Sequence, residues 1–362
     1  MQKSYRELFG GSLHLTLKSG AAILSDYPKS KKALAKVIKN LNAADKKRNT
    51  LFKEGTQVPP LIIVSTTDEC NLRCSGCYSC EFKKDERKEI TPQRKSEFYN
   101  EASDLGVGII MLAGGEPLLS REWLDGLAAH PELLGIVFTN GTLFTKERVD
   151  WFNANRHIIP ALSIEGDEQQ TDMRRGAGVY KTVLKSMSDL KDAGVPFGVS
   201  ITVTKDNLGN LLSDSFIDLY MDKGARMFIF VEYVPVAKST ESLVLSQEEK
   251  EKLQEFCAAQ RKKKPALFIP FPGDEEPFGG CLAAGRGFLH INAGGAIEPC
   301  PFAPLSDVSI NNMSLKQALS SNLLKKVREN HHLLKEGNGG CALWSNRALL
   351  EEMGIVSVKN EI

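Results

Sequence analysis

The sequence alternates regularly between short apolar runs and helix-like stretches from residue 61 onward. The apolar runs are rich in β-branched residues and lie at 61–66, 107–114, 133–140, 157–164, 196–204 and 226–233. The helix-like stretches between them lie at 92–105, 121–129, 145–154, 180–193 and 208–223. Buried strands that alternate with helices are typical of parallel βαβ units. Six such units predict an α/β barrel, complete or partial, with a doubly wound open sheet as the alternative.

Two regions flank this repeating part, which we place at residues 58–270. Residues 1–57 carry a net charge of +8, and apolar residues recur at helical spacing in 34–41. They predict a basic, mostly helical arm, and a solvated helix packed on the body is favoured over a dedicated docking surface. Residues 271–362 contain three further cysteines and predict a small cysteine-bearing domain, with a hairpin over 287–300 and a helix over 314–329.

The composition limits the classes of function. The chain has 362 residues, 42% of them hydrophobic and 25% charged, with a formal net charge of +1. This near-neutral balance gives no indication of nucleic acid as a partner. No apolar segment approaches the roughly 18 residues that a membrane-spanning helix needs, and the N-terminus lacks the layout of a signal peptide. We therefore expect a cytoplasmic protein, in which eight cysteines favour metal ligation over disulfides.

Four cysteines lie close together in "CNLRCSGCYSC", residues 70–80, directly after the first apolar run. Cys70, Cys74 and Cys77 have the spacing C-x3-C-x2-C, and the loops that follow barrel strands commonly form active sites. Three thiolates can hold three irons of a cubane cluster and leave the fourth iron open to another ligand. A zinc site, with Cys80 as the fourth ligand, is the alternative. The spacing also differs from that of bacterial two-cluster ferredoxins.

Further motifs follow the next strands in order. "GGEP" (114–117), "TNG" (139–141) and "SIEG" (163–166) each stand at the end of a predicted strand. Together with "CNLRCSGCY", they resemble the motifs of the radical S-adenosylmethionine (SAM) superfamily. The resemblance implies a partial (β/α)6 barrel of the TIM type that holds a [4Fe–4S] cluster. It further implies reductive cleavage of SAM to a 5′-deoxyadenosyl radical, which abstracts hydrogen from a substrate.

The resemblance also implies a set of SAM-binding residues. Gly114 and Gly115 would allow close approach of the backbone to the ligand, Glu116 would accept from the SAM ammonium, and Pro117 would stiffen the turn. In isolation, "GGEP" is equally a tight strand-to-helix turn. Tyr78 would meet the adenine through its backbone, while its ring is as well suited to packing.

The later motifs add three polar residues. Ser163 and Glu165 would hydrogen-bond the ribose, although the family more often has Asp at the position of Glu165. Asn140 would bind SAM or act as a turn residue. Arg174, in "DMRRG", would face the SAM carboxylate or remain solvated.

The second set of cysteines resembles the auxiliary-cluster domains called SPASM and, in shortened form, Twitch. Cys281 and Cys300 flank the predicted hairpin, and Cys341 would be a third ligand. Three cysteines imply one auxiliary cluster rather than two, with its fourth position open, filled by Cys257 or Cys80, or filled by another residue type. Buried apolar cysteines or a zinc site are the alternatives.

The remaining thiols and imidazoles have ordinary interpretations. Cys257, inside an amphipathic helix, and Cys80 are expected to be packing residues. The histidines at 290, 331 and 332 have no partner at ligand spacing and are interpreted as structural.

The favoured function is therefore a radical SAM enzyme with one auxiliary cluster. Relatives of this layout modify peptides or proteins, oxidise small alcohols or act on tetrapyrroles, so a peptide, a protein or a small molecule is the expected substrate. The resemblance implies flavodoxin or ferredoxin as electron donor, and the basic arm is a conceivable docking surface for it. Glu232, Asp274 and Glu275 are candidates for a general base. A non-catalytic iron–sulfur carrier or scaffold and a zinc-stabilised binding protein are the alternatives.

Overall fold

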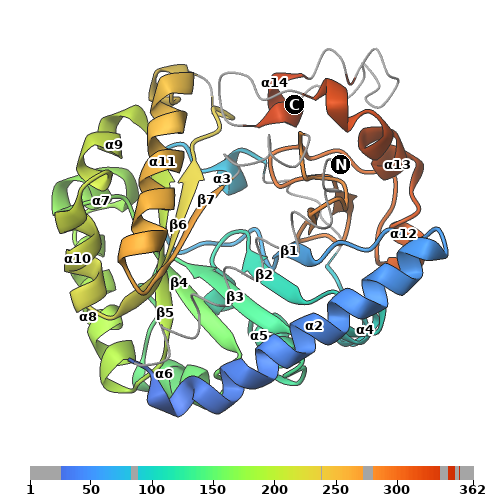
Figure 1. Cartoon of the computed structure of the whole chain (residues 1–362), viewed down its shortest axis with the longest axis horizontal. Helices are drawn as coiled ribbons and strands as arrows, with labels where there is room; N and C mark the ends of the chain where they lie inside the picture. Colours follow the sequence, from blue (N-terminus) through green and yellow to red (C-terminus); the bar gives the residue numbers. More distant parts are fainter. Residues whose placement is uncertain are drawn as a thin grey trace.

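A sheet of nine strands organises the part of the chain that the structure describes (Figure 1). The structure is a computed structural model that describes residues 26–82, 89–237, 239–271, 280–334, 341–346 and 350. The strand order is β7-β6-β5-β4-β3-β2-β1-β8-β9, and every neighbouring pair is parallel except β8 and β9. The strands are β1 Leu61–Ser65, β2 Ile109–Ala113, β3 Leu134–Thr139, β4 Ile158–Ile164, β5 Phe197–Val203, β6 Ala225–Glu232, β7 Leu267–Phe271, β8 Phe288–Ile291 and β9 Ile297–Glu298.

Helices follow the strands in alternation and cover the outside of the sheet (Figure 1). The strand order β1 to β6 follows the chain, so the predicted partial α/β barrel is confirmed and the open doubly wound sheet is excluded. The α-helices are α2 Lys31–Lys53, α3 Tyr78–Glu81, α4 Pro92–Leu105, α5 Arg121–Ala128, α6 Lys146–Ala154, α7 Glu168–Arg175, α8 Val179–Asp192, α9 Lys205–Leu211, α10 Asp214–Asp222, α11 Gln247–Lys263, α12 Leu315–Ala318, α13 Asn322–Glu329 and α14 Ala342–Ser345. Short 3₁₀ turns lie at Pro28–Ser30, Pro117–Leu119, Glu241–Leu243 and His331–Leu333. None of the helices in these described segments is long and apolar enough to cross a membrane.

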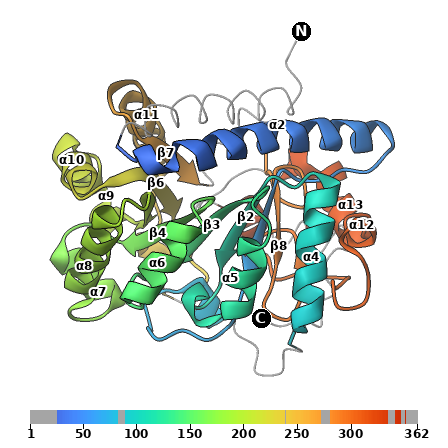
Figure 2. The same ribbon diagram turned by 90° about the horizontal axis from the view of Figure 1, so that it is seen from below.

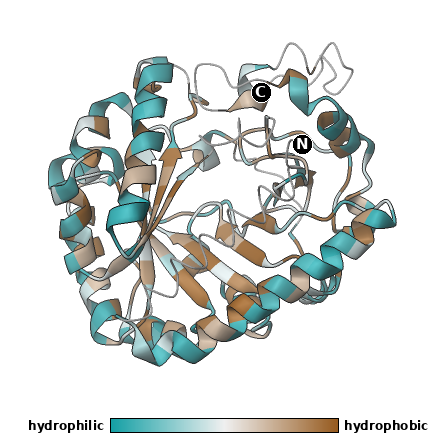
Figure 3. Cartoon of the chain, viewed as in Figure 1, coloured by the Kyte–Doolittle hydropathy of each residue, from teal (hydrophilic) through white to brown (hydrophobic). Residues whose placement is uncertain are grey.

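The two faces of the strands bury different sets of apolar residues. The outer face packs against the apolar sides of the helices, whose hydrophilic sides point outward (Figure 3). A second, smaller cluster lies on the other face of the strands and consists of Ile136, Ala161, Met227 and Ile229. Several of its neighbours, such as Met111 and Phe138, are only half-buried. The inner face of the barrel is therefore apolar and partly accessible.

The predicted helix of the N-terminal arm is present as α2, and it lies across the ends at which the strands begin (Figure 2). Arg48 donates to the carbonyl oxygen of Gly106 at 2.6 Å, just before β2, and Asn40 donates to that of Pro131, before β3. The hydroxyl of Tyr27 donates to the carbonyl oxygen of Gly224, before β6. The helix thus closes the end of the barrel opposite to the loops that follow the strands.

The C-terminal part extends the barrel sheet. The predicted hairpin is present as β8 and β9, and β8 pairs in parallel with β1, so that Ile63 faces His290. The helix expected over 314–329 is instead two helices, because Ser321 caps α13 by accepting from the backbone N–H of Leu324. The sequence analysis also missed β7, which ends one edge of the sheet and therefore tolerates Pro270.

Candidate functional site

Cys70, Cys74 and Cys77 lie on the loop between β1 and α3, at the end of the barrel where the strands finish. Cys70 is exposed, and the other two are half-buried. Desolvation raises the pKa of the Cys74 thiol, while Arg175 and Arg174 oppose this by favouring the thiolate. Desolvation likewise raises the pKa of Cys70, and the neighbouring thiols add to it, which places the three sulfurs within electrostatic reach of one another.

N–H donors surround these sulfurs. The backbone N–H of Leu72 donates to Cys70 Sγ at 3.4 Å, and Asn140 Nδ2 lies 3.9 Å from the same sulfur. Arg175 Nη1 lies 4.0 Å from Cys74 Sγ. Such donors stabilise thiolates, which are the form that ligates iron. In the described ranges, no three His, Cys, Asp or Glu side chains converge on a point that could hold a single metal ion.

The loop after β2 packs tightly against the cysteine loop. The N–H groups of Gly115 and Glu116 donate to the carbonyl oxygens of Thr67 and Glu69, both at 2.8 Å. Gly114 has a φ of +107°, and a Cβ added there would lie 2.7 Å from the oxygen of Thr67. A Cβ on Gly115 would collide with the carbonyl of Glu69. The two glycines are thus required by the contact between the two loops, whatever ligand the loops also hold.

Glu116 joins the loops after β2 and β3. Its buried carboxylate accepts from the N–H of Asn140 at 2.8 Å, from Thr139 Oγ1 at 2.7 Å and from the N–H of Leu118 at 3.0 Å, with Pro117 starting the 3₁₀ turn that follows. Desolvation raises the pKa of Glu116, and these hydrogen bonds oppose the increase. Its predicted contact with the SAM ammonium would have to be made by a carboxylate that already has three donors.

Asn140 has a larger role than a turn residue. Its Nδ2 donates to Asn71 Oδ1 at 2.8 Å, and its Oδ1 accepts from the N–H of Thr142 at 3.0 Å. Asn71 itself lies between Cys70 and Cys74. The "TNG" motif therefore fixes the cysteine loop from the side of β3.

Glu165 forms a buried ion-pair cluster with two arginines. Its Oε1 lies 2.6 Å from Arg174 Nη1 and 2.6 Å from Arg175 Nη2, and its Oε2 accepts from the N–H of Thr202 at 3.0 Å. Arg174 also donates to Thr202 Oγ1, and its carbonyl oxygen accepts from Ser75 on the cysteine loop. Arg174 is therefore held in this ion-pair cluster rather than solvated. Ser163, the other predicted ribose ligand, is half-buried on β4 opposite Ser200.

The second set of cysteines is brought together from three segments. Cys281, Cys300 and Cys341 are all buried. The thiols of Cys300 and Cys341 share a hydrogen bond, and burial together with both neighbouring thiols raises the pKa of Cys300 well above its usual value. The N–H of Trp344 donates to Cys341 Sγ at 3.4 Å. Three thiols in one place fit the predicted auxiliary cluster as a donor set.

Tyr78 and Cys80 lie at the margins of these two sets. The ring of Tyr78 packs edge-on against Phe302 with centroids 5.1 Å apart, which supports its packing role. Desolvation strongly raises the pKa of Tyr78, and Cys77 and Cys300 are the next causes, so the phenol lies between the two sets. Cys80 shares a hydrogen bond with Cys77, and burial raises its pKa to about 11. Cys80 thus belongs spatially with the first set.

Of the other candidate residues, some make structural contacts and some lie outside the residues that the structure describes. Glu232 is buried and lies 3.6 Å from Lys250 Nζ, an ion pair between β6 and α11. Asp274 and Glu275 lie outside the described residues. Cys257 is buried in the main apolar core, as predicted. The sequence analysis missed the contacts of Arg175 with Glu165 and Cys74, because a second arginine in "DMRRG" carries no spacing signal.

Comparisons with known proteins agree with this geometry. Residues 64–210 match the family model of the Radical SAM superfamily. The chain is 27% identical to the AdoMet-dependent heme synthase of Methanosarcina barkeri, over 80% of this chain and 89% of that protein. It is also 27% identical to the mycofactocin maturase MftC of Mycolicibacterium smegmatis, over 70% of this chain and 67% of the relative. The fold resembles that of Streptococcus suis SuiB bound to S-adenosylmethionine, with a TM-score of 0.62 and 16% identity, over 77% of this chain and 70% of SuiB.

Proposed function

Since this chain is a radical SAM enzyme, we propose that it modifies a peptide or protein by hydrogen abstraction, aided by one auxiliary iron–sulfur cluster. The observation that carries the proposal is the presence of two separate sets of three cysteines near one end of the barrel, one open and one buried. The open set is suited to a cluster that binds SAM. The buried set is suited to a cluster that has no contact with SAM.

The proposed cofactor site uses residues from four successive strand ends. Cys70, Cys74 and Cys77 would hold a [4Fe–4S] cluster, which with bound SAM supplies the 5′-deoxyadenosyl radical. Gly114 to Pro117, Asn140, Ser163, Glu165 and the backbone of Tyr78 are proposed to surround SAM. The support is that Gly115, Glu116 and Asn140 are already bound to the loop of the three cysteines. Their hydrogen bonds keep the loop in one shape before any ligand is present.

The proposed auxiliary site is formed by Cys281, Cys300 and Cys341. Its support is that three buried cysteines from distant parts of the sequence lie near one another, with Cys341 and Cys281 both affecting the thiol of Cys300. A Twitch-like domain is therefore proposed for this region. The fourth ligand of the site is left to experiment, and Cys80 is a poor candidate because its thiol neighbours are those of the first set.

A peptide or protein substrate is supported by relatives and by the inner surface of the barrel. The mycofactocin maturase is one such relative, and SuiB has been solved with its precursor peptide SuiA. The half-buried apolar side chains on the inner face could receive an apolar side chain of a peptide. A tetrapyrrole is the second candidate, because the similarity to the heme synthase extends over more of the chain than the similarity to the maturase.

We also propose an acidic flavodoxin or ferredoxin as electron donor and a cytoplasmic location. All eight cysteines are free, which is typical of a reducing compartment. The structure changes the expected docking surface: α2 lies at the far end of the barrel from the cysteine loop, so a donor is expected to approach the loop itself. Arg73, exposed on that loop, offers a positive charge there.

Anaerobic reconstitution with iron and sulfide tests the proposed function. We expect iron–sulfur absorbance and, with dithionite and SAM, formation of 5′-deoxyadenosine. A protein that binds zinc and remains colourless would support the binding-protein alternative, and a brown protein that never cleaves SAM would support the electron carrier. Incubation with a peptide fraction and with a tetrapyrrole, each followed by mass spectrometry, separates the two substrate classes.

A further inference from the structure

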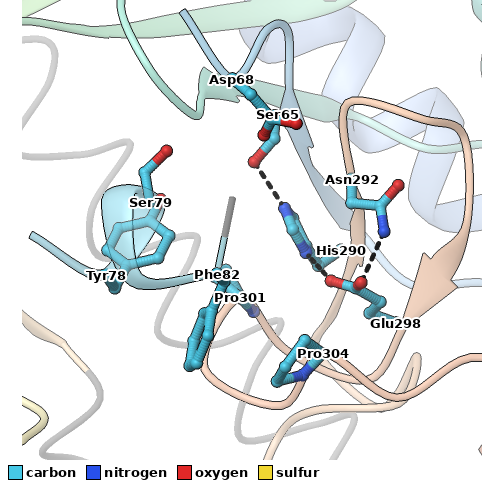
Figure 4. Close-up of a pocket in the computed structure, with 10 residues that line it drawn as sticks. All are labelled: Ser65, Asp68, Tyr78, Ser79, Phe82, His290, Asn292, Glu298, Pro301 and Pro304. Carbon is cyan, nitrogen blue, oxygen red and sulfur yellow. Dashed lines mark hydrogen bonds and ion pairs between the residues drawn. The ribbon is translucent and has the colours of Figure 1, made fainter. Parts of the chain in front are cut away.

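Three side chains form a hydrogen-bonded line in a pocket that borders the cysteine loop (Figure 4). Ser65 Oγ lies 2.8 Å from His290 Nε2, and His290 Nδ1 lies 2.7 Å from Glu298 Oε2. Asn292 Nδ2 donates to the other carboxylate oxygen of Glu298 at 2.6 Å. All four side chains belong to residues that are at least nine-tenths buried.

The fold fixes this line through strand register. His290 faces Ile63 in the β1–β8 pair, so Ser65, two residues further along β1, lies beside the end of β8. His290 faces Glu298 directly in the β8–β9 hairpin. The sequence analysis interpreted His290 as structural because its partners are distant in sequence or hidden by an unrecognised pairing. The structure gives it partners at both ring nitrogens.

The hydrogen bonds set the direction in which a proton can move along the line. A carboxylate beside Nδ1 holds the proton of the imidazole on that nitrogen, which leaves Nε2 as an acceptor for the hydroxyl of Ser65. Asn292 fixes the orientation of Glu298, so that the carboxylate cannot turn away. A serine hydroxyl in this arrangement can pass its own proton to Nε2 while it receives one from a ligand. The resulting imidazolium would be stabilised by Glu298.

The pocket indicates what the line could serve. Ser65 and His290 face Ser79, Tyr78 and Phe82 of the segment after Cys77, across a cavity of about 20 Å³ (Figure 4). That volume holds about one water molecule or one terminal hydroxyl or amino group. Tyr78 directly follows Cys77, and its ring packs against Phe302, two residues after Cys300, so the pocket borders both proposed cluster sites.

A nucleophilic role for Ser65 is less well supported. Ser65 ends a regular strand, and positive φ outside glycine occurs in the described chain only at Ser239 and Ala284. The strained turn that presents the serine of many hydrolases is thus absent at this position. The cavity also leaves little room for the tetrahedral intermediate of acyl transfer. These observations favour transfer of a proton alone.

We propose that Ser65, His290 and Glu298 form a proton relay that acts as general base toward a hydroxyl or ammonium group of the substrate. The inference rests on the proposed function. In the step, the O–H or N–H bond of the substrate breaks and its proton goes to Ser65 Oγ, while the proton of Ser65 moves to His290 Nε2. The substrate retains the electron pair, and no oxidant or reductant is needed.

The tautomer of His290 is measured without any substrate. Nitrogen-15 NMR of the full-length protein with labelled histidine reports the protonation of each ring nitrogen, and the His290→Gln variant identifies the signals among the six histidines. We expect a neutral ring with the proton on Nδ1 and a bare Nε2. A proton on Nε2 in the resting protein would overturn the relay, since that nitrogen could then accept nothing from Ser65.

Turnover with a peptide fraction of a cell extract tests the role itself. A general base contributes about 10²- to 10⁴-fold, so we expect His290→Ala to lower product formation by about 100-fold, while 5′-deoxyadenosine still forms within about twofold of wild type. Imidazole added to this variant should restore product, because the deleted ring leaves a space of its own shape. Ser65→Ala should lower product about tenfold or more and should not respond to imidazole.

A control variant and two separate outcomes distinguish failure of the relay from failure of the proposed function. His130→Ala removes a half-buried imidazole that lies between α4 and α5, where it contacts Gly126, Asn100 and the ring of Tyr99, and should not change product formation. If wild type forms no 5′-deoxyadenosine, the proposed function fails. If wild type forms both products and His290→Ala retains the modified peptide at the wild-type rate, the relay fails and the proposed function stands.

Discussion

The two sets of cysteines differ in almost every physical respect. Cys70, Cys74 and Cys77 lie within one short loop, and Cys70 is exposed. Cys281, Cys300 and Cys341 come from three segments, and all are buried. The first set has an arginine and an amide donor close to its sulfurs. In the second set, the thiols of Cys300 and Cys341 are hydrogen-bonded to each other. One set is thus preorganised for an exchangeable ligand, and the other is enclosed.

The two regions also differ in how many buried polar contacts hold them in place. The loops after β1, β2, β3 and β4 and the end of α7 are joined by buried hydrogen bonds and ion pairs through Glu116, Asn140 and Glu165. Around the second set, apolar side chains pack closely, and Arg286 donates to the carbonyl oxygens of Gly280 and Cys281. A cofactor with an open position needs a loop that keeps its shape in water, and polar cross-links provide that shape. An enclosed cofactor obtains its rigidity from packing.

The largest effect is expected from Cys74→Ala. Removal of this sulfur takes away one of three proposed thiolates, so SAM cleavage should fall below detection, measured as 5′-deoxyadenosine by chromatography. Cys80→Ala is the matched control, because Cys80 lies beside the same loop without a proposed ligand role. Loss of cleavage in both variants would show that four thiols, rather than three, belong to the site.

Glu165→Gln should destabilise the first region strongly. The substitution leaves Arg174 and Arg175 buried without their carboxylate, which costs about 3 kcal/mol of unfolding free energy or more. Glu168→Gln, at the start of α7, breaks the exposed pair with Lys181 and should cost less than about 1 kcal/mol. Denaturant unfolding compares the two variants. Equal losses would mean that the ion-pair cluster does not hold the cysteine loop.

Cys300→Ala should separate the two sets functionally. We expect iron content to fall while cleavage of SAM without substrate stays detectable, because the first set is untouched. Iron analysis and the 5′-deoxyadenosine assay on the same sample give both values. A loss of cleavage equal to that of Cys74→Ala would contradict the separate roles.

The smallest effect concerns the basic arm. Reversal of Lys36 and Lys39 to Glu changes exposed charges on α2, at the far end of the barrel, and should alter the rate of reduction by flavodoxin less than twofold. Arg73→Glu, on the cysteine loop, should slow reduction and weaken its dependence on salt. Stopped-flow measurements at two ionic strengths test both variants. If the α2 substitutions slowed reduction more than Arg73→Glu did, α2 would be the docking surface.

Sequence periodicity was sufficient for the barrel because each strand is buried and each helix has one apolar side. The sequence also indicated the first cysteines, since all three ligands lie within eight residues. It could not indicate that Gly114 and Gly115 are needed for a contact between loops, because that contact joins residues almost fifty positions apart. The division of the helix over 314–329 depended on one capping serine, which resembles other serines in sequence.

The polar side chains were predicted less well than the elements that carry them. Arg174 was expected either to face SAM or to be solvated, and its pairing with Glu165 was not foreseen, because the two residues are brought together only by the fold. His290 was interpreted as structural because it has no partner at ligand spacing, and its contact with Ser65 depends on the β1–β8 pairing, which is not visible in the sequence. Side-chain partners depend on register, and register is a property of the folded sheet.

The most direct test of the two-site account is electron paramagnetic resonance of the reduced, reconstituted protein before and after addition of SAM. We predict signals of two clusters in wild type, of which only one changes when SAM is added. A protein with Cys281, Cys300 and Cys341 all replaced by alanine should retain only the signal that responds to SAM. A single signal in wild type, or a SAM response that disappears in this triple variant, would contradict the assignment of an open and an enclosed site.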